Sequence, residues 1–290
     1  MSGVLRLDKS IKVIKARRAG FCFGVKRAVD MAFRAAEKGG NVFTLGPLIH
    51  NPEVIEILGL RGVSPIENID DRRIRTLIIR THGVSREISE KLSDKGYKIV
   101  DATCPFVKKA QQYAKLLRDD GYQVVIIGDV EHPEVKGLMS YAGDDAIVIQ
   151  KDDALPHLKS RVGVVIQTTQ PVGVLKKFIH DAVEHVKELK VFNTICNSTA
   201  LRLKETKEMA KKVDLMIVVG GKNSANTTQL AHLCTSMSVP TYHIETASEI
   251  KKGWFSNVHK VGITAGASTP DWIIEEVEDR IREIDIGGRG

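Results

Sequence analysis

The feature that most constrains this chain is a threefold internal repeat. Each repeat places one cysteine between a short β-favouring run and a helical stretch. The three segments are VIKARRAGFCFGVKRAVDMAFRAA, KIVDATCPFVKKAQQYAKLLRDDG and VFNTICNSTALRLKETKEMAKKV, and their cysteines are Cys22, Cys104 and Cys196. Self-similarity of this kind indicates a fold assembled from copies of one supersecondary unit.

The repeat continues downstream of each cysteine. An apolar run that ends in glycine follows each helix (NVFTLG, QVVIIG and LMIVVG), and a polar loop comes next. The spacing is 28 residues from Cys22 to His50, from Cys104 to His132 and from Cys196 to Ser224. Another apolar strand and polar loop complete each repeat, with His82, Thr168 and Ser268 in these second loops.

Apolar strands that alternate with helices favour α/β units with parallel sheets buried on both faces. We therefore expect three small α/β lobes over residues 24–103, 104–193 and 194–284, with a strand in residues 11–23 joining the third lobe. Ligands bind beyond the carboxyl ends of parallel strands, where all the polar loops fall. A pseudo-threefold trefoil of lobes would bring these loops to one central cavity.

The composition excludes several classes of protein. Apolar residues make up 42% of the 290, too many for a disordered chain, and four cysteines are too few for a disulfide scaffold. The absence of a long apolar segment predicts a soluble, cytoplasmic protein that does not interact with a membrane. We assign the net charge of +7 to exposed helix faces such as KKAQQYAKLLR and RLKETKEMAKKV. With only 5% aromatic residues, the chain offers little for base stacking, so no specific nucleic acid is expected.

Three cysteines in the same register suggest ligands to one metal centre. Each precedes a helix, whose N-terminus favours the thiolate. Zinc would usually take four protein ligands, whereas a 4Fe-4S cluster held by three cysteines leaves one iron open to substrate. A cluster is the favoured interpretation, and zinc or unligated thiols remain alternatives. Cys234 has no counterpart in the repeat and is predicted to be a small core residue.

The polar loops predict an anion site. They supply imidazole, hydroxyl and amide groups beside loop N–H groups, as in His50, His82, His132, Thr168, Ser224, Asn226 and Ser268. Neither a P-loop nor a dinucleotide fingerprint is present, so we expect a small phosphorylated metabolite. Glu134 is the candidate proton donor, because a carboxyl group shielded from water has a raised pKa. A cap in the first turn of a helix is the alternative role for Glu134.

At this point the motifs can be compared with a known family. AGFCFGVKRAV, LGPLIHNPEV, IRTHGVS, DATCPFVKKA, GDVEHPEVKG, QTTQ, NTICNST, GGKNSANT and TAGASTPDW run in order from Ala19 to Trp272. The set resembles the 4-hydroxy-3-methylbut-2-enyl diphosphate reductases, iron–sulfur enzymes of the non-mevalonate isoprenoid pathway. The resemblance implies a trefoil around a 4Fe-4S cluster with one iron that lacks a protein ligand.

The resemblance also implies roles for individual residues. Cys22, Cys104 and Cys196 would hold the cluster, and Glu134 would relay protons with His132 and Thr168. The substrate would be bound, mostly through its diphosphate, by His50, His82, His132, Thr168, Ser224, Ala225, Asn226 and Ser268. His132 and Thr168 would lie near the substrate hydroxyl. The reaction would be reductive dehydroxylation to isopentenyl and dimethylallyl diphosphate, with electrons from a carrier such as ferredoxin or flavodoxin.

One position departs from the family pattern. The loop Lys222–Asn226 reads KNSAN where the family commonly has KNSSN, so any side-chain hydrogen bond from residue 225 is lost. We expect that serine at position 225 would tighten substrate binding slightly. Two alternative functions remain, namely a quinolinate synthase-like cluster enzyme, whose substrates lack a diphosphate, and a non-enzymatic iron–sulfur sensor.

Overall fold

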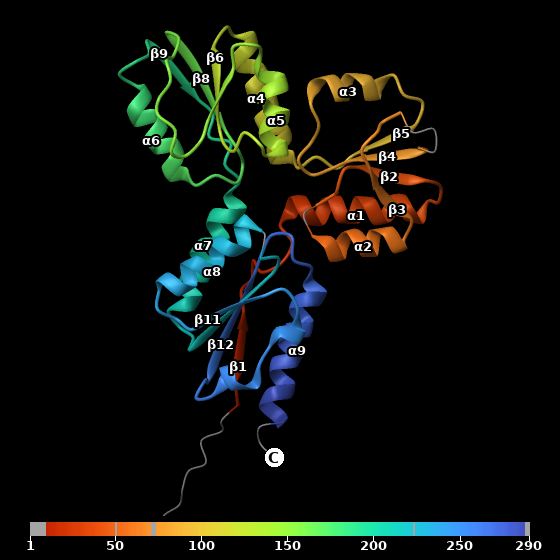
Figure 1. Ribbon diagram of the computed structural model, residues 1–290, viewed down its shortest axis with the longest axis vertical. Helices are drawn as coiled ribbons and strands as arrows, with labels where there is room; N and C mark the ends of the chain where they lie inside the picture. Colours follow the sequence, from red (N-terminus) through yellow and green to blue (C-terminus); the bar gives the residue numbers. More distant parts are fainter. Residues whose placement is uncertain (1–9, 50, 71–73, 223, 288–290) are drawn as a thin grey trace, which may run out of the picture. The chain divides into compact units, whose positions relative to one another are not determined.

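The computed structural model describes residues 10–49, 51–70, 74–222 and 224–287 (Figure 1). In this part of the chain the strands form three four-stranded sheets, and every strand pair is parallel. The first sheet comprises β2 (Val42–Leu45), β3 (Val63–Ile66), β4 (Thr76–Ile79) and β5 (Lys98–Asp101). The second comprises β6 (Gln123–Ile127), β7 (Ile147–Ile149), β8 (Arg161–Ile166) and β9 (Glu188–Val191). The third comprises β1 (Lys12–Lys15), β10 (Leu215–Val219), β11 (Thr241–Ile244) and β12 (Lys260–Ala265).

Helices connect the strands. They are α1 (Phe23–Glu37), α2 (Pro52–Leu60), α3 (Arg86–Ser93), α4 (Pro105–Asp119), α5 (Pro133–Ala142), α6 (Val172–Ala182), α7 (Asn197–Ala210), α8 (Ala225–Ser236) and α9 (Asp271–Gly287). Two short 3₁₀ helices, η1 (Ala247–Glu249) and η2 (Lys252–Phe255), lie between β11 and β12. The expected α/β class with parallel sheets is confirmed.

The three sheets share one strand order. They read β5-β4-β2-β3, β9-β8-β6-β7 and β1-β12-β10-β11 when each is followed from the strand that leads to a cysteine. That strand lies at the sheet edge in every case, beside the strand that ends in the second polar loop. The third sheet takes its edge strand from the beginning of the chain and its other strands from the end. The repeat in the sequence is therefore a repeat of topology.

The described chain divides into two compact units. One is continuous and runs from Phe23 to Asn197, so it holds the first two sheets. The other joins Met1–Cys22 to Ser198–Gly290 and holds the third sheet. The proposed lobe boundaries and the trefoil arrangement of the lobes stay predictions.

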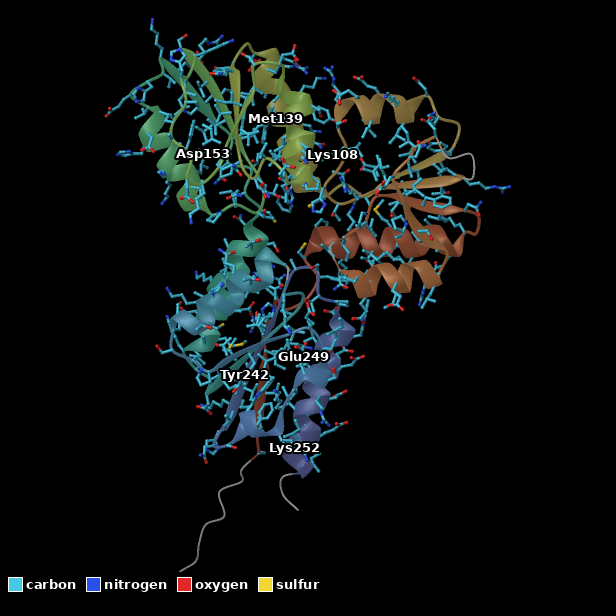
Figure 2. All side chains as sticks on the ribbon, viewed as in Figure 1. Lys108, Met139, Asp153, Tyr242, Glu249 and Lys252 are labelled. Atoms are coloured by element: carbon cyan, nitrogen blue, oxygen red, sulfur yellow. The ribbon has the colours of Figure 1, made fainter. Side chains whose placement is uncertain are left out.

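The cores form as expected for sheets covered on both faces. Every residue of β6 and of β10 is buried, and valine, isoleucine and leucine dominate both strands. Burial of one such side chain is worth roughly 1.5–3 kcal/mol. Cys234 lies in α8 with no exposed area, which confirms it as a core residue. In the same unit, the rings of Tyr242 and Trp254 stack at 3.8 Å; Tyr242 is labelled in Figure 2.

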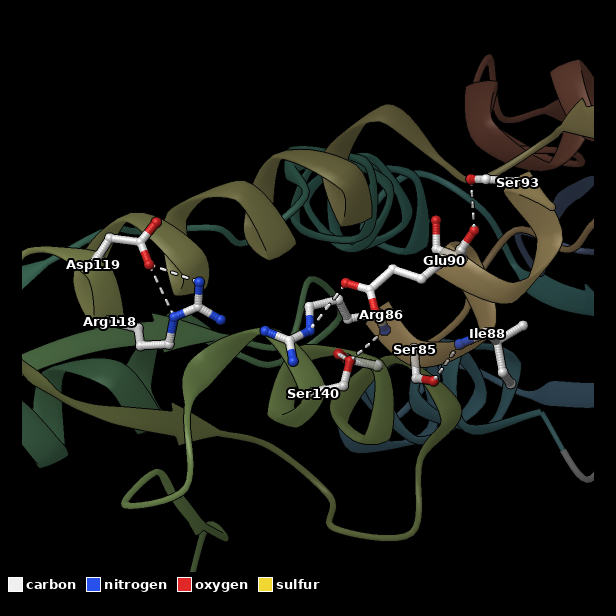
Figure 3. A network of polar contacts seen from close by, with 10 residues as sticks. Ser85, Arg86, Ile88, Glu90, Ser93, Arg118, Asp119 and Ser140 are labelled. Carbon is white, nitrogen blue, oxygen red and sulfur yellow. Dashed lines mark hydrogen bonds and ion pairs between the residues drawn. The ribbon is translucent and has the colours of Figure 1, made fainter.

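Within the continuous unit, polar contacts connect α3 to α5 (Figure 3). The Ser85 hydroxyl caps α3 by accepting from the N–H of Ile88 at 3.4 Å. The next N–H, that of Arg86, donates to the Ser140 hydroxyl on α5 at 2.9 Å. The loop between β4 and α3 is thereby attached to α5, whose second residue is the candidate acid Glu134.

One prediction about the charged helix faces is wrong. Arg202, in the stretch RLKETKEMAKKV, is only 2% exposed rather than solvated. Its Nη1 and Nη2 atoms donate to three backbone carbonyl groups, which compensates for much of its burial, while its Nε is buried without a partner among the described residues. As for membranes, the helices of the described residues are all too short or too polar to cross one.

Candidate functional site

Each of the three repeat cysteines is held in the same way. The backbone N–H of Cys22 donates to the carbonyl of Ala267 at 3.0 Å. The corresponding bonds run from Cys104 to Thr81 at 2.9 Å and from Cys196 to Thr168 at 2.7 Å. The accepting residue lies two positions beyond the end of β12, β4 or β8, the neighbour of the strand that leads to the cysteine. Equivalent hydrogen bonds thus place three equivalent thiols.

The cysteines also lie at equivalent helix starts. Cys104 is the N-cap residue of α4, while α1 and α7 begin directly after Cys22 and Cys196. All three are partly exposed, in contrast to Cys234. Cysteine sulfur atoms are the ligands that iron–sulfur clusters and zinc prefer, and partial exposure leaves all three within reach of such a group. The chemistry of this donor set therefore fits an iron–sulfur group.

The three cysteines are divided between the two compact units. Cys22 belongs to one compact unit, whereas Cys104 and Cys196 belong to the other. Among the residues described, no three His, Cys, Asp or Glu side chains are grouped so that they could hold a metal ion. The sharing of one metal centre by these cysteines stays a prediction.

Glu134 is the buried acid of the continuous unit. It lies in the first turn of α5 with 1% of its surface exposed. Its Oε1 accepts from the backbone N–H of Thr168 at 2.7 Å, and its Oε2 accepts from the Thr168 hydroxyl at 2.8 Å. Because the Thr168 carbonyl accepts from Cys196, one residue connects the acid to a cysteine of the site.

Burial governs the protonation of the Glu134 carboxyl group. Burial raises the pKa of its carboxyl group from 4.5 to about 7, although both hydrogen bonds from Thr168 act in the opposite direction. A carboxyl group with this pKa is present in both protonation states at neutral pH, as a general acid requires. The expectation of a raised pKa at Glu134 is confirmed, and the residue also occupies the helix first turn that was its alternative role.

His132 combines two features. It is the N-cap of α5, where its Nδ1 accepts from the N–H of Glu134 at 3.1 Å, so a proton on the neutral ring lies at Nε2. Its ring also meets that of His82 edge to face, with centroids 5.2 Å apart. His82 itself directly follows Thr81, the acceptor for Cys104. The continuous unit therefore brings His82, His132, Glu134 and Thr168 together near two cysteine segments.

The other unit holds the remaining described candidates. Ser224 is the N-cap of α8, and its hydroxyl accepts from the N–H of Thr227 at 3.4 Å. The side-chain amide of Asn226 is buried, and neither of its polar atoms has a hydrogen-bond partner within the described residues. Such an amide suits a polar ligand. Ser268, partly buried, directly follows Ala267, the acceptor for Cys22.

Salt-bridged residues support the loop before α8. The Nζ of Lys222 contacts the Oε2 of Glu249 at 2.7 Å, and the Lys222 N–H donates to Glu245 Oε1 at 2.8 Å. Glu249 is labelled in Figure 2. These contacts hold Lys222, two residues before Ser224, against Glu245 and Glu249.

Two predicted contacts fall outside what the structure describes. His50 is not among the described residues, and the surroundings of the Ala225 side chain are likewise not described. Asn51, the residue after His50, is the N-cap of α2 through its Oδ1, which accepts from the N–H of Val54 at 3.1 Å. Asn51 is therefore the cap equivalent to His132 and Ser224, one residue beyond the shared spacing of 28.

Sequence reasoning missed two residues that shape the cysteine segments. Gly24 in α1 is buried, and a methyl group in its place would lie 2.7 Å from the Sγ of Cys104. The position of Gly24 two residues after Cys22 could have signalled such a close approach. Arg202 is the second, and its place in a run of charged residues hid its burial.

Comparison with known proteins agrees with this arrangement. The fold and the site define a parallel α/β protein with three cysteines suited to an iron–sulfur group and one buried acid. The family model described as LytB protein matches residues 13–282. The chain belongs to this family. It is 50% identical over 283 residues to the 4-hydroxy-3-methylbut-2-enyl diphosphate reductase of Geobacter sulfurreducens, covering 97% of this chain and 100% of the relative. The reductase of Pelobacter propionicus is 51% identical over 277 residues, which cover 94% and 99% of the two chains.

Solved structures give the same result. A structure of (E)-4-hydroxy-3-methyl-but-2-enyl diphosphate reductase, the terminal enzyme of the non-mevalonate pathway, matches with a TM-score of 0.77 and 44% identity. It covers 94% of this chain and 99% of its own. The E-1-hydroxy-2-methyl-but-2-enyl-4-diphosphate reductase of Plasmodium falciparum matches with a TM-score of 0.81 and 25% identity, over 93% and 87% of the chains.

Proposed function

We propose that this protein reduces 4-hydroxy-3-methylbut-2-enyl diphosphate to isopentenyl and dimethylallyl diphosphate, the last step of the non-mevalonate isoprenoid pathway. Two electrons and two protons are consumed, the allylic C–O bond breaks, and the oxygen leaves as water. The observation that carries the proposal is the Glu134–Thr168 pair, a buried acid bonded to the residue that holds Cys196. The full-length similarity to reductases of this name supports it.

Cys22, Cys104 and Cys196 are the proposed ligands of a 4Fe-4S cluster. When bound, the cluster would supply single electrons and a Lewis-acidic iron that lacks a protein ligand. The proposed electron source is an external one-electron carrier such as ferredoxin or flavodoxin, and the proposed location is the cytoplasm.

Glu134 and Thr168 are the proposed proton path. The Thr168 N–H occupies Oε1 of Glu134, so the proton of the neutral acid resides on Oε2, which faces the Thr168 hydroxyl. A hydroxyl group can accept a proton on one side and donate its own on the other. Thr168 can therefore pass a proton from the buried acid toward the leaving hydroxyl of the substrate. His132, next to the first turn of α5 that carries Glu134, is proposed to bind that hydroxyl.

The remaining loop residues are the proposed diphosphate contacts. They are His50, His82, His132, Ser224, Ala225 through its backbone N–H, Asn226 and Ser268. Three of the helices involved begin at polar caps, and helix N-termini attract anions. The buried, unpartnered amide of Asn226 is the strongest structural support for a polar ligand in this group.

The test is anaerobic reconstitution with iron and sulfide, followed by an iron count, electron paramagnetic resonance and product analysis with a chemical one-electron donor. We expect about four irons per chain and both five-carbon diphosphates as products. Glu134→Gln should keep the iron and bind substrate but lose turnover. A protein that binds iron but leaves the substrate unchanged would refute the reductase assignment, and normal turnover by the glutamine variant would refute the role of Glu134.

A further inference from the structure

The helix that follows each cysteine contacts the segment that precedes another one. In the continuous unit, Arg27 on α1, five residues after Cys22, donates to the carbonyls of Asp101 and Thr103 at 3.3 and 3.2 Å. Thr103 immediately precedes Cys104. The contact therefore runs from the helix behind one proposed ligand to the backbone just ahead of the next.

Arg202 makes the same kind of contact in the other unit. It lies on α7, six residues after Cys196, and its guanidinium donates to the carbonyl groups of Gly20 at 2.9 Å and of Arg18. Its Nη1 also donates to Ala265, the last residue of β12, at 2.7 Å. These acceptors lie in the segment that leads to Cys22 and at the strand end beside it.

The burial of Arg202 shows that these bonds are not incidental surface contacts. The residue is 2% exposed, and a buried guanidinium is tolerated only where hydrogen bonds compensate for lost water. Burial lowers the pKa of Arg202, as expected for a guanidinium enclosed by the carbonyl groups of the segment that leads to Cys22.

Glu205, one helical turn further along α7, binds the same segment as Arg202. We call these side-chain contacts to the backbone ahead of a cysteine, including those of Arg27, the clamp. Its two carboxylate oxygens accept from the backbone N–H groups of Arg17 at 2.8 Å and of Arg18 at 3.1 Å. A cation on α7 therefore binds the carbonyl groups of this segment, and an anion on the same helix binds its N–H groups. Together they satisfy backbone groups that lie beyond the end of β1.

The clamped segment has little room to adopt another path. Gly20 has a φ of +94°, and a Cβ at this position would lie 2.7 Å from the Oδ1 of Asp271. On its far side, the segment ends with the bond from Cys22 to Ala267. The backbone on both sides of the thiol is consequently fixed by named contacts.

The helix α4, which follows Cys104, contacts the segment before Cys196 through stacked rings instead of hydrogen bonds. Tyr113 on α4, the helix behind Cys104, stacks on Phe192, four residues ahead of Cys196, with centroids 4.0 Å apart and rings 5° from parallel. Arg18 is likewise four residues ahead of Cys22. The helices α1, α4 and α7 therefore each contact the segment that precedes a different cysteine from the one they follow.

We propose that Arg202 and Arg27 are positioning residues that fix the backbone ahead of Cys22 and Cys104 and thereby set the places of these thiols for the iron–sulfur group. The ligand role of the thiols rests on the proposed function, whereas the clamp itself is a property of the metal-free chain. The two parts can be tested separately.

The first experiment measures hydrogen exchange in the metal-free, full-length protein. Arg202→Met should speed exchange of the amides of residues 17–22 at least tenfold, and Arg27→Met should do the same for residues 102–104. Trypsin should cut Arg202→Met faster after the exposed Arg17 and Arg18. Arg280→Met, which removes an exposed ion pair on α9, is the matched control and should match wild type. Unchanged exchange and cleavage in both clamp variants would overturn the proposal.

Milder variants keep the test decisive if a methionine variant fails to fold. Arg202→Lys retains the charge but cannot bond several carbonyl groups through a planar fork, so we expect a smaller loosening of residues 17–22. Glu205→Gln retains one acceptor oxygen for two N–H groups and should loosen Arg17 and Arg18 alone. Wild-type exchange in both of these folded variants would equally overturn the clamp.

The second experiment measures iron. After reconstitution, Arg202→Met and Arg202→Lys should lose iron to a chelator at least tenfold faster than wild type and give an altered electron paramagnetic resonance signal. A loosened segment with wild-type iron retention and spectrum would overturn the positioning role. If the wild-type protein takes up no iron, the proposed function fails, whereas the clamp is still judged by hydrogen exchange alone.

Discussion

Both carboxylate oxygens of Glu134 accept hydrogen bonds from one residue, Thr168, through its N–H at 2.7 Å and its hydroxyl at 2.8 Å. Two bonds from one partner fix the plane of a carboxyl group that has almost no contact with solvent. The hydroxyl is the only one of the two donors that can reverse its role and accept a proton.

The free energy of unfolding should depend on pH through the titration of Glu134. Its pKa is raised from 4.5 to about 7, so the folded state binds the proton more tightly than the unfolded state. The contribution to stability is therefore complete below pH 4.5 and is lost as the pH rises toward 7, by about 3 kcal/mol. Glu134→Gln lacks this titration. Urea unfolding of both proteins from pH 4.5 to 8 should show the difference between them change with pH, and a constant difference would contradict the assignment.

Thr168 can be dissected with a matched pair of variants. Thr168→Val keeps the shape and the backbone N–H but removes the hydroxyl, so Oε2 of buried Glu134 loses its donor at a cost of about 1–3 kcal/mol. Thr168→Ser keeps both donors. We expect reduced unfolding free energy and lost turnover in the valine variant, with both largely retained in the serine variant. Equal turnover in the two variants would exclude a role for the hydroxyl in proton transfer.

His132 has a capping role that can be separated from ligand binding. His132→Ala removes the acceptor for the N–H of Glu134 and should lower the unfolding free energy by about 1 kcal/mol. His132→Asn restores a cap acceptor, as Asn51 supplies in α2, but not the imidazole. We therefore expect normal stability in the asparagine variant and weakened substrate binding in both, measured by chemical denaturation and calorimetry. Normal affinity in the asparagine variant would restrict His132 to capping.

A larger residue at position 24 should affect iron binding, because Gly24 lies against the Sγ of Cys104. Gly24→Ala places a methyl group 2.7 Å from the Sγ of Cys104, so the thiol must move. The control is Gly59→Ala in α2, where nothing lies within 4 Å of the new methyl group and helix propensity favours alanine by up to about 1 kcal/mol. We expect lower iron content after reconstitution for Gly24→Ala only. Equal iron content in the two variants would show that Cys104 tolerates the displacement.

Much of the fold could be predicted because the repeat is carried by local patterns. Apolar runs marked the central strands, and cysteines in a common register marked three strand-to-helix turns. Glu134 could be singled out as the acid of the HPEV motif, but the sequence could not settle its burial, since Glu53 in the counterpart HNPEV is only partly buried. Residues that act through backbone contacts were harder to find. Arg202 sits in a charged stretch whose composition resembles a solvated helix face, and only long-range contacts reveal its carbonyl partners.

The caps illustrate a second limit of sequence spacing. The shared interval of 28 residues aligned His50 with His132 and Ser224, whereas the structure caps α2 with Asn51. The extra residue shows in the sequence as HNPEV in place of HPEV, so Pro52 and Val54 lie one position later relative to Cys22 than Pro133 and Val135 do relative to Cys104. The helix start is decided by Pro52 at the first helical position and by the Asn51 side chain.

The pairing of β1 with β12 has a consequence for the order of assembly in the cell. A ribosome makes Cys22 long before β12 and Ala267, which pair with β1 and with the backbone of Cys22. The continuous segment Phe23–Asn197 can fold while synthesis proceeds, whereas the unit that contains Cys22 must wait until β12 has been made. Under the proposed function, an iron–sulfur group that needs all three thiols can enter only after that point, and a nascent chain stalled before β12 should accumulate without it.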